Sequence, residues 1–210
     1  MFLKIVIALF SVGVPLLIAE MLRNYTQVHR EITRKVAHIG TAIGISVAPF
    51  YLSWEVVRVL AIALLIIVVL ALYFKWGHGM YSVRRKTNGE ILFPIAVIGV
   101  SLLASSPAIF CAAILHLGLA DGFAAITGTL WGKKHTYRVL GDKKSYVGTI
   151  TCFLVSLLIL IGFNIWSNDP VSWNIILLLP FLATFFENIG VRGTDNVTVP
   201  MVVVVALSSL

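Results

Sequence analysis

GLADGFAAITGTLWGKKHTYRVLGDKKSYVGT, residues 118–149, is the stretch around which the rest of the sequence is organised. It places one aspartate, Asp121, inside an apolar run that continues to Trp131. A short loop rich in Lys and Arg follows, and Gly148 and Thr149 open the next apolar run. A carboxylate is costly to bury in an apolar segment, so Asp121 indicates a functional site. Together with cations and a helix N-terminus, it suits the binding of a phosphate with a metal ion.

The composition of the whole chain is that of a membrane protein. Of the 210 residues, 59% are hydrophobic and 12% are charged, and the mean hydropathy is +0.98. Soluble domains are about half apolar and a quarter charged. We therefore expect an all-α fold, a polytopic integral membrane helical bundle that forms a single domain over residues 1–210.

Apolar runs of a length suited to crossing a bilayer, about 20 residues, recur along the chain. They cover 2–22, 36–53, 55–74, 91–106, 107–131, 148–166 and 174–190. An eighth run, 197–210, has only fourteen residues and is short for a full crossing. The sequence thus predicts seven to eight transmembrane helices.

Lys and Arg residues lie in alternate loops between these runs. The loops after the first, third, fifth and seventh runs hold 14 of the 16 basic residues, and the intervening turns hold none. By the positive-inside rule the basic loops are cytoplasmic and the N-terminus is outside. The net charge of +7 therefore reports topology, and we expect no nucleic-acid partner.

Three acidic residues are predicted to lie near one membrane depth toward the cytoplasmic side: Asp121 inside the run 107–131, Glu187 at the end of the seventh run and Asp195 before the eighth. Mg²⁺ prefers such hard oxygen ligands and commonly takes one or two carboxylates together with phosphates and water. We therefore predict a metal site at these three residues, with Asp121 and Glu187 also catalytic. Two alternatives stay open: Asp121 as a packing carboxylate paired with a cation or hydroxyl, and Asp195 as a helix cap.

Helix packing around Asp121 is also predicted. Gly118, Gly122 and Ala125 fall on nearly the same helical face, where small side chains let a second helix approach closely.

The segment from Gly141 to Thr149 is the best candidate for phosphate binding. Lys143, Lys144 and the Ser145 hydroxyl suit phosphate oxygens, and free N–H groups near Gly148 and Thr149 add the positive end of a helix. The alternative is that these lysines only set topology and touch anionic lipid.

A further polar cluster is predicted where the second and fourth runs begin. Arg34 and His38 are four residues apart on one helical face, beside Lys35. His38 is interpreted as a phosphate ligand or proton shuttle, or else as a hydrogen-bonded packing residue. Glu90 either caps the fourth run or joins the cluster.

Six motifs occur in a fixed order over about residues 34–200. They are RKVAHIG (34–40), GEILFP (89–94), LADGFAAITG (119–128), GKK (132–134), LGDKKSYVGT (140–149) and ENIGVRGTDNVTVP (187–200). As an ordered set they resemble the CTP-dependent lipid-alcohol kinases: dolichol kinase, phytol kinase and the yeast-type diacylglycerol kinase.

The resemblance implies a kinase that uses CTP and Mg²⁺ to phosphorylate a membrane-embedded alcohol at the cytoplasmic face. It adds Lys133, Lys134 and Asn196 to the expected nucleotide contacts. The chain lacks the long N-terminal set of extra spans of eukaryotic dolichol kinases, which points to a compact relative in a prokaryotic plasma membrane.

Two rival functions use the same residues. A weaker likeness to phosphatidate cytidylyltransferases implies release of pyrophosphate instead of CDP. A transporter would bind a cation at Asp121 and Glu187, but the polar groups crowd one side of the membrane. The identity of the lipid alcohol and the oligomeric state stay open, although the small-residue faces permit an oligomer.

Overall fold

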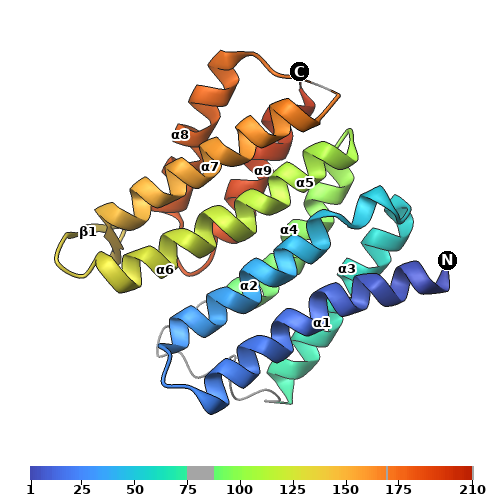
Figure 1. The fold of residues 1–210 in the computed structure, drawn as a ribbon, viewed down its shortest axis with the longest axis horizontal. Coiled ribbons are helices and arrows are strands. Elements are labelled where there is room, and N and C mark those ends of the chain that lie inside the picture. Colours follow the sequence, from blue (N-terminus) through green and yellow to red (C-terminus); the bar gives the residue numbers. More distant parts are fainter. Residues whose placement is uncertain (75–87, 169, 210) are drawn as a thin grey trace.

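The computed structural model describes residues 1–74, 88–168 and 170–209 as a bundle of helices with one two-stranded sheet (Figure 1). The helices are α1 (Phe2–Tyr25), α2 (Arg30–Ser46), α3 (Trp54–Tyr73), α4 (Gly89–Leu103), α5 (Pro107–Leu115), α6 (Asp121–Trp131), α7 (Tyr146–Trp166), α8 (Trp173–Ile189) and α9 (Asp195–Ser208). A 3-10 turn, η1 (Ala48–Phe50), follows α2, and a π-helical turn, η2 (His116–Ala120), joins α5 to α6. The all-α prediction is confirmed, with the small sheet as an addition.

Four helical spans in the described ranges are long and apolar enough to cross a membrane. They are α1, α3, the continuous span Pro107–Trp131 and α7. Helices α4, α8 and α9 are apolar but shorter, with 15, 17 and 14 residues. Large apolar side chains such as Phe10, Ile67 and Leu158 are exposed on the long helices. The chain is therefore a membrane protein, and the count of seven to eight crossings stays a prediction.

The span Pro107–Trp131 is the most buried of the four, with 67% of an apolar 18-residue stretch inside the protein. It lies between α2 and α7 in Figure 1. A Cβ atom added to Gly118 would collide with Ala42, and one added to Gly122 would collide with Ile39. This confirms that small residues around Asp121 admit a neighbouring helix, and it identifies that helix as α2.

The central span Pro107–Trp131 is not one regular α-helix. The π turn η2 lies directly before Asp121. A π turn inserts backbone into the helical repeat and changes the direction of the residues that follow it, and such turns are frequent at functional sites. The direction in which Asp121 points is therefore set by a local irregularity that hydropathy does not reveal.

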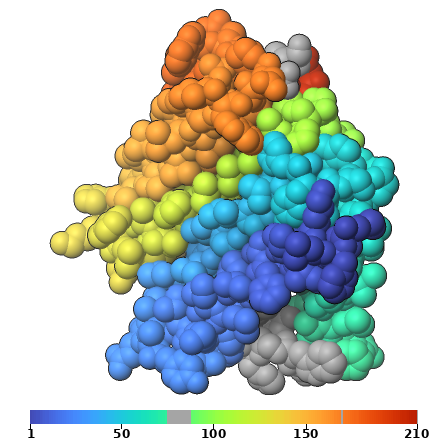
Figure 2. Space-filling model, turned by 45° about the vertical axis from the view of Figure 1, so that its right-hand side comes forward, coloured from blue at the N-terminus to red at the C-terminus, as the bar shows by residue number. Residues whose placement is uncertain are grey.

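The basic loop after α6 is a β-hairpin formed by β1 (Thr136–Val139) and β2 (Asp142–Ser145). The strands are antiparallel, with Tyr137 opposite Lys144 and Arg138 opposite Lys143. Leu140 and Gly141 have φ values of 49° and 89°, as a two-residue hairpin turn requires. Figure 2 shows this segment, in yellow, projecting at one side of the molecule.

Candidate metal and phosphate site

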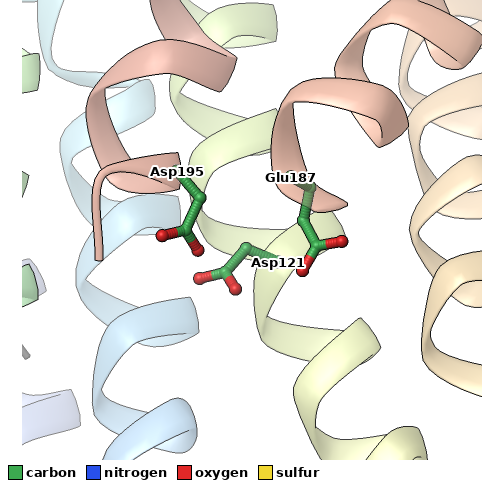
Figure 3. Close-up of side chains that lie close together, drawn as sticks. All are labelled: Asp121, Glu187 and Asp195. Carbon is green, nitrogen blue, oxygen red and sulfur yellow. The ribbon is translucent and has the colours of Figure 1, made fainter. Parts of the chain in front are cut away.

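Three carboxylates from three elements lie close together (Figure 3). Asp121 begins α6, Glu187 lies near the end of α8, and Asp195 begins α9. Each offers a carboxylate oxygen, and these oxygens lie within 4.8 Å of one another. Asp121 and Glu187 are buried, so their mutual repulsion is poorly screened and requires cations nearby. An all-oxygen set of this kind fits Mg²⁺.

A tight loop between α8 and α9 brings Glu187 and Asp195 together. A Cβ atom on Gly190 would collide with Asp195, so only glycine allows this approach. Gly193 has φ of 91°, and a Cβ atom there would meet the backbone of Gly89 at the start of α4. The two glycines therefore place the loop against α4 and close the distance between the two acids.

Asp121 is paired with a buried cation as well as clustered with other carboxylates. The Lys35 ammonium nitrogen lies 2.5 Å from Asp121 Oδ2 and is contributed by α2. Among the described residues no hydrogen bond or ion pair engages the other oxygen, Oδ1, which leaves it available to a metal ion. The two interpretations that the sequence left open for Asp121 are thus compatible.

His38 lies beside the same carboxylate. Its Nε2 atom is 3.2 Å from Asp121 Oδ2 and 2.9 Å from the carbonyl oxygen of Leu117. Because both neighbours are acceptors, we assign the hydrogen to Nε2, which donates. This arrangement favours His38 as a group that orients Asp121 over one that accepts a proton at Nε2.

Glu187 is paired with a lysine from the hairpin. The Lys144 ammonium donates to Glu187 Oε1 and to the Glu187 carbonyl oxygen, both at 2.7 Å. Burial lowers the pKa of Lys144, but the neighbouring Glu187 carboxylate more than offsets this, so the pKa lies above its ordinary value. Lys144 is therefore charged at neutral pH, and the carboxylate cluster is flanked by two ammonium groups.

These groups open into a cleft of about 1290 Å³. Protein sites for drug-sized ligands span roughly 300–1,000 Å³, so the cleft has room for a nucleotide and an acceptor group. Its lining carries seven Lys and Arg side chains from three of the loops predicted to be cytoplasmic: Arg30, Arg34, Lys35, Lys133, Lys143, Lys144 and Arg192. The basic residues of the fourth loop, Lys75, Arg84, Arg85 and Lys86, lie outside the described residues.

Most of the residues predicted for phosphate binding line this cleft. Lys133, Lys143, Ser145, Gly148 and Thr149 do so, together with Lys144 and Asn196. Lys134 is exposed and is not part of the lining.

Ser145 and Asn196 also have structural contacts. The Ser145 hydroxyl accepts a hydrogen bond from the Gly148 N–H at 3.1 Å and caps α7, so one of the N–H groups expected to face phosphate is already satisfied. The Asn196 amide donates to the carbonyl oxygen of Gly89 at 3.1 Å.

The additional polar cluster assembles on the α2 side of the cleft. Arg34 donates to both carboxylate oxygens of Glu31. Burial lowers the pKa of Arg34, but Glu31, Asp121 and Glu90 more than offset this and raise it above the ordinary value. Glu90 lies in the first turn of α4 and is one of the neighbouring charges that raise this pKa.

Two residues near the site were not predicted, Tyr137 and Asn188. The Tyr137 hydroxyl donates to Asn188 Oδ1 at 2.5 Å and is hydrogen-bonded to the Thr149 hydroxyl. Asn188 lies in the motif 187–200, next to Glu187, but was given no role there, and Tyr137 lies between two motifs.

The chain is 28% identical over 200 residues to phytol kinase from Synechocystis sp., an alignment that covers 90% of this chain and 83% of that protein. This similarity confirms the resemblance to the lipid-alcohol kinases. No protein-family model matches the chain. No solved structure matches it either.

Proposed function

We propose that this protein is a phosphotransferase that acts on a membrane lipid alcohol, with CTP as donor and Mg²⁺ as cofactor. The observation that carries the proposal is the cluster of Asp121, Glu187 and Asp195, flanked by Lys35 and Lys144, in a cleft at one end of a membrane bundle. The similarity to a phytol kinase supports an alcohol as acceptor. Phytol or a related isoprenoid alcohol is therefore the first acceptor to test.

The three carboxylates are the residues that would hold the metal. When bound, Mg²⁺ would offset the negative charge of the donor's phosphates. Lys144 reaches the cluster from the hairpin, and Lys133 and Lys143 add positive charge along the cleft wall. Cations held in place around a transferring phosphoryl group stabilise charge that develops in the transition state.

The acceptor hydroxyl must lose a proton during the transfer. Asp121 is the better candidate to accept it, because His38 Nε2 faces two acceptors and donates. In this assignment His38 fixes the orientation of the carboxylate. Lys35 contributes a positive charge beside Asp121.

The proposed orientation places the cleft at the cytoplasmic face of a prokaryotic plasma membrane, with the N-terminus outside. The clustering of seven Lys and Arg side chains around one cleft supports this assignment. Nucleotide would then reach the cleft from the cytoplasm, and the alcohol would reach it from the bilayer. The shorter helices α2, α4, α8 and α9 would complete the proposed seven to eight crossings around the longer spans.

The test is transfer of label from γ-labelled CTP to phytol, geranylgeraniol, a polyprenol or diacylglycerol by the purified protein with Mg²⁺. We expect a labelled lipid phosphate, and a loss of at least about 100-fold in kcat/KM for Asp121→Asn, which removes a charged metal ligand. A parallel series with γ-labelled ATP tests the nucleotide.

Pyrophosphate released from CTP when phosphatidate is supplied, with no labelled lipid phosphate from any alcohol, would instead identify a cytidylyltransferase. Equal activity of Asp121→Asn and the unaltered protein would refute the proposed site.

A further inference from the structure

Two side chains on one face of the hairpin contact the end of α8. Tyr137 and Lys144 are opposite each other in the strand register, so their side chains project on the same side of the hairpin. Lys144 binds Glu187, and Tyr137 binds the next residue, Asn188. The adjacent strand pair, Arg138 and Lys143, is exposed.

The Tyr137 contact belongs to a small neutral network. Thr149 in the first turn of α7 shares its hydroxyl with Tyr137 and lies 3.2 Å from Asn188 Oδ1. The Asn188 amide donates in turn to the carbonyl oxygen of Thr184 at 3.0 Å, which fixes the side chain on α8. One hydroxyl therefore links the hairpin to α7 and to α8 at once.

The Lys144 contact has a different character, because both partners are required elsewhere in the proposed reaction. Glu187 is a proposed metal ligand, and Lys144 is a proposed phosphate ligand. A metal ion at Glu187 and a phosphate at Lys144 would compete for the two groups of this pair. The charged attachment of the hairpin is therefore weakened at the moment when its lysine has to be held in position.

We propose that Tyr137 is a positioning residue that keeps the hairpin against α8, through Asn188 and Thr149, while Lys144 moves from Glu187 to a nucleotide phosphate. A hydroxyl–amide contact is suited to this role because its groups are neutral. A metal ion or a phosphate competes less strongly for neutral groups than for the charged groups of Lys144 and Glu187. The inference rests on the proposed function for the identity of the phosphate.

The test compares Tyr137→Phe with Tyr146→Phe. The two rings are adjacent, with centroids 4.8 Å apart, and Tyr146 is 58% exposed. Within the described part of the chain, the Tyr146 hydroxyl has no hydrogen-bond partner, so it is a matched control. We expect Tyr137→Phe to raise the Kd and KM for Mg²⁺–CTP about five- to tenfold, as for loss of one net hydrogen bond, with kcat changed less than about twofold.

Asn188→Ala tests whether the two residues act as one unit. The double variant Tyr137→Phe/Asn188→Ala should raise the Kd no further than Asn188→Ala alone, because both changes remove the same contact. Fully additive effects would refute the shared contact.

A second readout needs no turnover. In the nucleotide-free protein, amide hydrogen exchange across residues 136–145 should accelerate in Tyr137→Phe and remain unchanged in Tyr146→Phe. Faster exchange with an unchanged Kd would reduce Tyr137 to a structural contact and overturn the proposal. So would a lower kcat with an unchanged KM, or no change in either readout.

The proposed function and this inference fail in different ways. If the unaltered protein binds Mg²⁺–CTP but transfers no phosphate, the kinase assignment fails and the Kd still decides the role of Tyr137. If the unaltered protein does not bind CTP at all, both the nucleotide assignment and the positioning role are refuted. Amide hydrogen exchange then reports only how the hairpin is attached to α8.

Discussion

The bundle has hollows at its two ends, and they differ in charge. The larger contains the three clustered carboxylates and is lined by seven Lys and Arg side chains. The smaller, about 670 Å³, lies where α4 meets α5 and α7 meets α8, and the described residues that line it carry no charge. Its lining includes four serines from turns and helix ends: Ser105, Ser106, Ser172 and Ser208.

This difference bears on the class of function. A carrier that moves an ion across the membrane needs polar groups along a path between both faces. Among the described residues that line the two hollows, charged side chains occur at the larger one, while the smaller is lined by serines, Asn168 and apolar groups. The arrangement suits chemistry at one membrane face better than transport between two.

The largest effect that would sharpen this contrast is expected from Asp195→Asn. This change keeps the shape of the side chain but removes a charge from the carboxylate cluster. The Mg²⁺ concentration for half-maximal activity should rise about 100-fold, since changes around metal sites typically weaken binding by about 10- to 100-fold. A titration of activity with Mg²⁺ measures the shift.

Glu31→Gln is the matched control for Asp195→Asn. Glu31 lines the same cleft but is bound to Arg34 and lies outside the carboxylate cluster. We expect it to shift the Mg²⁺ requirement less than about threefold, in line with an effect through charge at the cleft alone. Equal shifts in the two variants would mean that general negative charge, and not a metal site, distinguishes this end of the bundle.

A smaller effect, on stability, is expected from Lys144→Met in the metal-free protein. The change leaves the buried Glu187 without its cation and should lower the free energy of unfolding by about 2 kcal/mol, as for loss of hydrogen bonds to a charged group. Lys143→Met, at an exposed neighbouring lysine, should change it by less than about 0.5 kcal/mol. Denaturant unfolding at pH 8 measures both.

The pH dependence of this difference has a definite sign. The pKa of Lys144 is raised above its ordinary value of 10.5 in the folded protein. Its contribution is therefore fully present below about pH 10.5 and is lost as the pH rises through the folded pKa. The difference in free energy of unfolding between Lys144→Met and the unaltered protein should therefore decrease in that pH range. An increase in this difference would contradict the assignment.

The smallest effect is expected from Ser106→Ala at the uncharged hollow. The Ser106 hydroxyl accepts a hydrogen bond from the Ile109 N–H at 3.3 Å and caps α5. Loss of the cap should cost about 1 kcal/mol of stability, while kcat/KM stays within about twofold. A large loss of activity without a loss of stability would show that the second hollow takes part in the function, and the contrast between the two ends would fail.

The candidate site was predictable where single residues carry the signal. Asp121 stood out because an acid inside an apolar run is rare and costly. Glu187 and Asp195 lie at the ends of apolar runs, so their depth followed from the same hydropathy pattern. The partner of Lys144 could not be predicted from the sequence, because a lysine beside a membrane span is equally suited to bind a phosphate, a lipid or a carboxylate.

The strands of the hairpin could not be read from the sequence. Each has only four residues, with charged and polar side chains and little apolar alternation, so the usual strand signal is missing. The turn at Leu140 and Gly141 was the only local cue.

The sequence by itself determined the helical membrane class, the apolar spans, the basic loops and the three acids of the candidate site. These properties belong to contiguous residues, because hydropathy and charge act over one helix length. Tertiary structure alone decided that Lys35 neutralises Asp121 across 86 residues and that Tyr137 reaches Asn188 across 51. It also decided that a π turn aims Asp121. Such contacts depend on how helices pack, and packing is set by many weak interactions between distant segments that no local pattern records.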